Sequence, residues 1–169
     1  MTGEVTEPMK HCVMVAAPHT SNWDFPFAMS TFWLMDVPVR FFIKDSYTKS
    51  IFGWFFKSLG AIGVNRENAQ NGLTEFAVEQ LKKHKQLVIL VPAEGTRKRV
   101  EKWRTGFYHI AQQAQVPIGL GYLDFAKKEA GVKSLFYPTG NLENDLSEIQ
   151  EVYKNIQGKI PENYNPIIH

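Results

Sequence analysis

The sequence is poor in cysteine and in long apolar runs, and its charges almost balance. Its one cysteine, Cys12, has no partner for an intramolecular disulfide, which suits a reducing compartment, and no Cys/His spacing typical of a zinc site occurs. No stretch approaches the roughly 20 apolar residues that cross a bilayer. The net charge of +2 argues against nucleic-acid binding through overall charge. We therefore expect a cytoplasmic chain without a metal site.

The pattern of apolar residues predicts one α/β domain over residues 1–169. Hydrophobic residues make up 44% and charged residues 21% of the chain, as in ordinary globular proteins. Short apolar runs alternate with segments of helical periodicity, which favours a mostly parallel, mixed sheet flanked by helices. The predicted strands are 12–17, 38–43, 60–64, 86–91 and 117–122, with a last apolar piece at 135–137, and the predicted helices are 22–35, 68–84, 105–115 and 143–157.

His19 and Asp24 follow the first predicted strand. Pro18 ends this apolar run, so we expect His19 on the loop at the carboxyl edge of the sheet, where α/β proteins bind ligands. Asp24 can accept a hydrogen bond from Nδ1 of the imidazole and leave Nε2 free to take a proton. No Gly-x-Ser-x-Gly nucleophile motif occurs. The pair predicts a base that activates a substrate hydroxyl; the alternative is an exposed histidine beside a helix-capping aspartate.

Three further motifs follow the His-x4-Asp pair. Residues 60–66 (GAIGVNR) are a short strand ending at an arginine, residues 94–97 (EGTR) follow the strand 86–91, and residues 116–118 (VPI) open another strand. In order and approximate spacing, the four motifs resemble those of the glycerophosphate acyltransferase family, which includes the 1-acylglycerol-3-phosphate acyltransferases of phospholipid synthesis. The resemblance runs from His19 to about Ile118.

The resemblance implies an O-acyltransferase in which His19 is the general base and Asp24 orients it and stabilises the imidazolium. Arg66 and Arg97 match the anion-holding arginines of the family, because a guanidinium presents paired donors that fit a phosphate or carboxylate. The other residues expected at the substrate site are Lys44, Glu94, Gly95 and Thr96. Of these, Glu94 is expected to hold Arg97 or a neighbouring backbone amide rather than to touch substrate.

The resemblance also implies the substrates. A thioester is already activated, so an acceptor hydroxyl can attack it without an acyl-enzyme, which explains the missing serine. Acyl-CoA or acyl-carrier protein is the expected co-substrate, with no other cofactor, and a lysophospholipid-like lipid, above all lysophosphatidic acid, is the expected acceptor. Pro18 stands where the family usually has asparagine, which leaves a non-phosphate acceptor such as a lyso-aminolipid open. Backbone amides near residues 21–24 are candidates for the oxyanion site.

An aromatic segment, residues 51–57, predicts peripheral contact with the inner face of the cell membrane. Its four large rings cannot all face one core, and Lys49 and Lys57 flank them as lysines flank interfacial anchors. The rings of the 22–35 helix could line an acyl-chain groove next to His19 or belong to the core. Members of the resembled family often carry a hydrophobic segment before the first strand, which here follows closely on Met1. We expect such a segment to be missing from this chain.

Three alternatives use parts of the same pattern. A catalytically silent lipid-binding module could keep the aromatic groove, but it would not need both His19 and Asp24. An acyl-thioester hydrolase would replace the acceptor hydroxyl by water, and then Arg66 and Arg97 would have no anionic acceptor to bind. A metal-dependent phosphoesterase could use His19, Asp24 and Glu94 as ligands, but the chain offers no evident further set of ligands.

Overall fold

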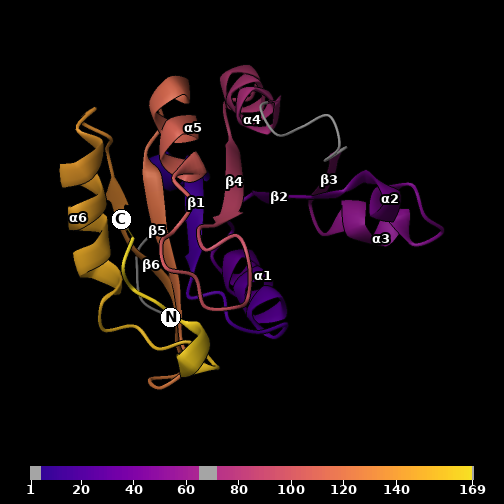
Figure 1. Cartoon of the computed structure of the whole chain (residues 1–169). Coiled ribbons are helices and arrows are strands. Elements are labelled where there is room, and N and C mark those ends of the chain that lie inside the picture. Colours follow the sequence, from indigo (N-terminus) through magenta and orange to yellow (C-terminus); the bar gives the residue numbers. More distant parts are fainter. Residues whose placement is uncertain (1–4, 65–71, 169) are drawn as a thin grey trace.

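A six-stranded sheet forms the centre of the computed structural model, which describes residues 5–64 and 72–168. The strands are β1 (His11–Ala17), β2 (Val39–Lys44), β3 (Ala61–Val64), β4 (Leu87–Pro92), β5 (Ile118–Asp124) and β6 (Glu129–Phe136). Their order is β3-β2-β4-β1-β5-β6 (Figure 1). The first five run parallel, and β6 pairs antiparallel with β5. This confirms the predicted α/β class with a mostly parallel, mixed sheet.

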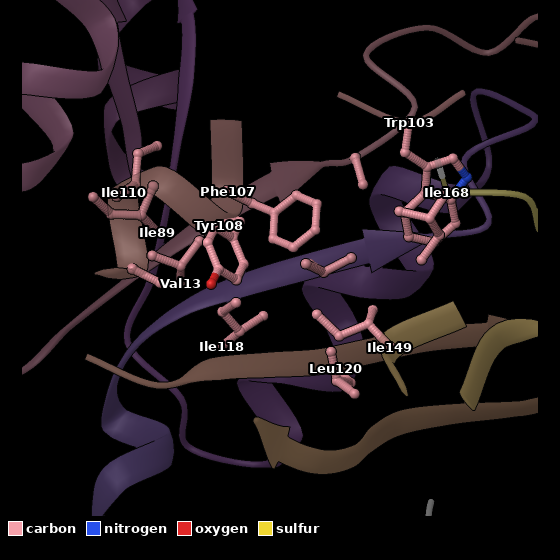
Figure 2. Packing of buried hydrophobic residues seen from close by; sticks show 14 of the residues in the cluster. Val13, Ile89, Trp103, Phe107, Tyr108, Ile110, Ile118, Leu120, Ile149 and Ile168 are labelled. Atoms are coloured by element: carbon pink, nitrogen blue, oxygen red, sulfur yellow. The ribbon is translucent and has the colours of Figure 1, made fainter. Parts of the chain in front are cut away.

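Helices cover both faces of the sheet. One face packs against α4 (Gly72–Lys83), α5 (Gly106–Ala114) and α6 (Leu142–Tyr153), and the other against α1 (Asp24–Leu34) and η1 (Glu7–Lys10). Each face of the sheet has its own hydrophobic core: the first core lies under α4, α5 and α6, and the second under α1 and η1. Side chains alternate along β1, so that Val13 and Val15 pack in the first core and Cys12 and Met14 in the second. Figure 2 shows Val13, Ile89, Ile118 and Leu120 packed against Phe107 and Tyr108. Burial on both faces explains why β1 has no polar alternation.

Cys12 belongs to the core of the protein. The side chain is fully buried, and its Sγ donates a hydrogen bond to the carbonyl oxygen of Met9. Burial raises the pKa of the thiol to about 12. Because the thiolate is the nucleophile, Cys12 is an inert core residue.

Two short helices, α2 (Asp45–Thr48) and α3 (Gly53–Ser58), lie beside the edge strand β3, on the right in Figure 1. Close backbone approach holds them there, since a Cβ on Gly63 would lie only 2.2 Å from Oγ1 of Thr48. Phe56 packs against the second core, whereas Phe52, Trp54 and Phe55 are exposed. The prediction that one core cannot bury all four rings is therefore confirmed.

The C-terminal segment returns to the carboxyl edge of the sheet. After α6 it passes through η2 (Pro161–Asn163) and binds the loop that follows the EGTR motif. Nε1 of Trp103 donates to the carbonyl oxygen of Asn165 at 2.9 Å, and the Asn165 amide donates to the carbonyl oxygens of Val100 and Glu101. Residues from the end of the chain thus fix a loop that begins at one of the predicted site motifs.

Candidate active site

The carboxyl edge of the sheet gathers the predicted site residues that the structure describes. β1 and β4 are adjacent and parallel, so the loops after them, which carry His19 and residues 94–97, leave the sheet side by side. Lys44 ends β2 on the other side of β4 and pairs with Val64 at the end of β3. Arg66 follows β3 in the sequence but lies outside the described residues.

His19 and Asp24 are in contact. Nδ1 of His19 lies 3.3 Å from Oδ2 of Asp24, and the exposed fractions of the two side chains are 23% and 4%. Nε2 has no hydrogen-bond partner among residues 5–64 and 72–168. The geometry therefore suits a base: a buried carboxylate holds one ring nitrogen while the other is left for a substrate proton.

Asp24 also closes the loop that carries His19. Its Oδ2 accepts the backbone N–H groups of Thr20 at 2.6 Å and Ser21 at 2.8 Å, and its Oδ1 accepts the Ser21 hydroxyl at 3.0 Å. Burial alone would raise the pKa of Asp24, but hydrogen bonds from His19, Ser21 and Thr20 outweigh it and hold the pKa below its ordinary value. Asp24 is therefore an ionised carboxylate at neutral pH.

These bonds correct the expectation about oxyanion donors. The Ser21 amide is engaged by Asp24, and the Trp23 amide donates to the Ser21 hydroxyl at 3.1 Å. Two of the four amides proposed for this role are therefore already used inside the loop. The turn they build also explains why α1 begins at Asp24 and not at Asn22.

Glu94 connects the two loops of the site. Its Oε1 accepts a hydrogen bond from the backbone N–H of His19 at 2.9 Å. Of the two partners that the sequence left open for Glu94, Arg97 or a backbone amide, the structure shows the amide. The residue is 3% exposed, and its Oε2 has no hydrogen-bond partner in the described part of the chain. Burial raises the pKa of Glu94, against the lowering effect of the His19 amide. Glu94 thus positions His19 from the loop that follows the neighbouring strand, β4.

Residues 95–97 form an exposed turn above Glu94. Gly95 has a φ of +69°, a left-handed conformation that glycine adopts without strain, and the Arg104 side chain lies against it. The Thr96 hydroxyl accepts the Lys98 amide. The side chains of Arg97 and Lys44 are exposed and have no ion pair with any described carboxylate. Both cations are therefore exposed at the carboxyl edge of the sheet.

An apolar cavity of about 150 Å³ opens beside the His19–Asp24 pair. It lies between α1, which contributes Phe25, Ala28 and Phe32, and the sheet. Phe32 is both a core residue and part of this wall, so the two interpretations of the aromatic helix are compatible. The cavity has room for a short apolar segment next to His19.

The wall formed by β5 was not predicted as part of the site. Gly121 and Tyr122 line the cavity. Gly119 precedes Gly121 by two residues in β5 and therefore lies on the same face of the strand. A Cβ on Gly119 would lie 2.7 Å from Sδ of Met14, and one on Gly121 would lie 2.6 Å from the carbonyl oxygen of Val15. The two glycines of residues 119–121 (Gly-Leu-Gly) could have indicated this wall from the sequence, since a glycine inside a strand often marks a close approach of another chain segment or a ligand.

Most of the large exposed apolar side chains gather in two segments. The first consists of Trp23 and helix α1, and the second runs from α2 through α3; their members are Trp23, Phe25, Phe27, Trp33, Leu34, Tyr47, Ile51, Phe52, Trp54 and Phe55. Within the described ranges, no helix has the length and apolar character needed to cross a membrane. The same residues contain no cluster of histidine, cysteine and acidic side chains that could hold a metal ion.

Comparison with known proteins shows the family of this chain. The family model described as Acyltransferase matches residues 1–119. A 1-acyl-sn-glycerol-3-phosphate acyltransferase from Streptococcus pneumoniae is 31% identical over 108 residues, which are 62% of this chain and 39% of that protein. The chain thus spans well under half the length of this relative, and no solved structure matches. Because the family match covers well over half of the chain, the chain belongs to the acyltransferase family.

Proposed function

We propose that this protein transfers a fatty acyl group from a thioester, acyl-CoA or acyl-carrier protein, to the hydroxyl of a lysophospholipid-like acceptor, with lysophosphatidic acid as the favoured acceptor. The observation that carries the proposal is the His19–Asp24 pair at the mouth of an apolar cavity. The activity named for the Streptococcus pneumoniae relative supports the choice of acceptor.

His19 acts as the base in this reaction. Its Nε2 takes the proton of the acceptor hydroxyl while the hydroxyl oxygen attacks the thioester carbon. The tetrahedral intermediate then expels the thiolate, which receives the proton back from the imidazolium. Asp24 favours the imidazolium because its carboxylate is ionised and only 3.3 Å from Nδ1. No acyl-enzyme is needed, since the acceptor itself is the nucleophile.

The cavity supplies the binding site for the acyl chain. Its walls are mainly apolar, so the part of an acyl chain that enters it gains free energy by leaving water, while the thioester carbonyl stays at the polar end with His19. The exposed cations Arg97 and Lys44 lie at the same edge of the sheet and fit an anionic headgroup.

The protein would work at a membrane surface, because its acceptor is a lipid. Ile51, Phe52, Trp54 and Phe55 are exposed on α3 and the turn before it, and Lys57 lies in the same helix. Aromatic rings at the acyl boundary with ammonium groups toward anionic headgroups are the usual arrangement of an interfacial anchor. We place this segment against the inner face of the cell membrane.

The variant His19→Ala tests the proposal. With long-chain acyl-CoA and lysophosphatidic acid, wild type should form phosphatidic acid and free thiol, and His19→Ala should lower the rate by about 10²–10⁴. His84→Ala is the matched control, because His84 is exposed at the end of α4. Free fatty acid as the main product would indicate a hydrolase, and no turnover with retained lipid binding would indicate a silent lipid-binding module. Either result, or a fully active His19→Ala, refutes the proposal.

A further inference from the structure

The segment 157–160 packs against the loop that carries His19. The backbone N–H of Ile160 donates to Oγ1 of Thr20 at 3.2 Å. Gly158 is buried against the same loop, since a Cβ there would lie 2.7 Å from Cγ2 of Thr20 and 3.1 Å from Cβ of Pro18. The two neighbours of Lys159 therefore touch the two neighbours of His19. The backbone of Lys159 lies beside the loop that carries His19.

The ammonium group of Lys159 is held on aromatic rings. Nζ lies 4.9 Å from the ring centre of Trp23, which precedes Asp24, and 5.8 Å from that of Phe125. A third ring, Phe27, contacts both, at centroid distances of 6.2 Å and 5.9 Å. Such contacts attract the cation but leave its charge uncompensated. The rings thus fix a positive charge beside the catalytic loop.

Four lysines of the described residues have ion pairs with carboxylates, and Lys159 is not one of them. Lys49 pairs with Asp45 at 2.6 Å, Lys154 pairs with Glu151, and Lys127 lies 3.8 Å from Asp124. Among residues 5–64 and 72–168, no carboxylate lies within ion-pair distance of Lys159. A fixed and unpaired cation beside a reaction centre is suited to bind an anion that arrives with substrate.

We propose that Lys159 binds a phosphate group of a substrate, from either the lipid acceptor or the nucleotide part of an acyl-CoA donor. This inference rests on the proposed function and deepens it. Lys159 lies outside residues 1–119, to which the family match is confined, so the match does not assign it. The residue determines specificity and does not take part in proton transfer.

The test compares Lys159→Met, which keeps an unbranched apolar side chain on the rings, with Lys159→Arg, which keeps the charge. Lys154→Met is the matched control, because it removes an exposed lysine that is already paired. The acceptors are lysophosphatidic acid and the phosphate-free monoacylglycerol. The donors are acyl-CoA and the phosphate-free acyl thioester of N-acetylcysteamine. Equilibrium binding of CoA and of lysophosphatidic acid is measured in parallel, without turnover.

Lys159→Met should raise the KM and the Kd of one phosphate-bearing substrate about 10- to 100-fold, as expected for one charge-assisted bond, with little change in kcat. Lys159→Arg should restore most of the loss, and Lys154→Met should show none. A loss with lysophosphatidic acid but not with monoacylglycerol assigns the phosphate to the acceptor. A loss with acyl-CoA but not with the short thioester assigns it to the donor.

Two results would overturn the inference. The first is an unchanged KM and Kd for both phosphate-bearing ligands. The second is a lower melting temperature of Lys159→Met with equal losses for phosphate-bearing and phosphate-free substrates, because this would mean that the cation–π contact only stabilises the loop. If wild type transfers no acyl group, the proposed function fails, and the binding measurements still decide the role of Lys159.

Discussion

Replacing Asp24 separates its two tasks, the support of the loop and the polarisation of His19. In wild type the carboxylate accepts two backbone amides and a hydroxyl from the loop, in addition to its contact with Nδ1 of His19. Asp24→Ala removes every acceptor. Asp24→Asn keeps one side-chain oxygen. To accept the amides of Thr20 and Ser21, this oxygen must take the place of Oδ2 of Asp24. That is also the place nearest to Nδ1 of His19.

The expected sizes of the two effects differ. Asp24→Ala leaves the amides of Thr20 and Ser21 without partners in a buried turn, and at about 1–3 kcal/mol each the total loss of unfolding free energy is about 2–6 kcal/mol. For a chain of this length that lowers the melting temperature by roughly 5–20 °C. Asp24→Asn retains both amide bonds and buries no charge, so its cost should be at most about 1.5 kcal/mol.

Activity should fall in both variants, although for different reasons. Asp24→Asn keeps an acceptor opposite Nδ1 and so preserves the ring orientation, but it removes the negative charge that stabilises the imidazolium. We expect acyl transfer to drop by about 10²-fold, the lower end of the contribution of a general base. Urea unfolding and initial rates with acyl-CoA measure the two effects. Equal stability of Asp24→Ala and wild type, or full activity of Asp24→Asn, would refute this account of the loop.

Two further predictions concern Glu94 and the exposed rings of α3. Burial raises the pKa of Glu94 above its ordinary 4.5. The folded protein therefore favours the protonated carboxyl group, and this contribution to stability is lost as the pH rises from the pKa of Glu94 in the unfolded chain through its higher pKa in the folded protein. Over this pH range the urea midpoint of wild type should therefore fall relative to that of Glu94→Gln. A difference between the two urea midpoints that stays constant with pH would contradict the raised pKa of Glu94. Joint replacement of Trp54 and Phe55 by serine should abolish sedimentation with anionic vesicles and barely change the melting temperature, because both rings are exposed. Tyr137→Ser, an exposed ring on another surface, should leave sedimentation intact, and unimpaired binding by the double variant would place the anchor elsewhere.

Much of the fold could be predicted because its signals are local. Strands buried on both faces, such as β1 and β4, appear as continuous apolar runs, and each is ended by a proline or a polar loop. The strand β6 was seen only as the short piece 135–137, because its exposure is mixed and no such run marks its start at Glu129. The His19–Asp24 contact was also predictable, since it joins a loop to the first turn of the following helix.

The contacts that hold the site in place are not local, and for this reason the sequence did not reveal them. Glu94 binds the His19 amide across 75 positions, and Ile160 binds Thr20 across 140. No periodicity or motif connects such positions; only the adjacency of β1 and β4, and the return of the C-terminal segment, brings them together. The loop with His19 is therefore held by three groups of contacts: with Asp24 in the same motif, with Glu94 on the loop after β4, and with residues 158–160. It follows that the chain beyond residue 119, outside the family match, is part of the candidate active site, and that its substrate preference need not be the same as that of relatives that share only the motifs.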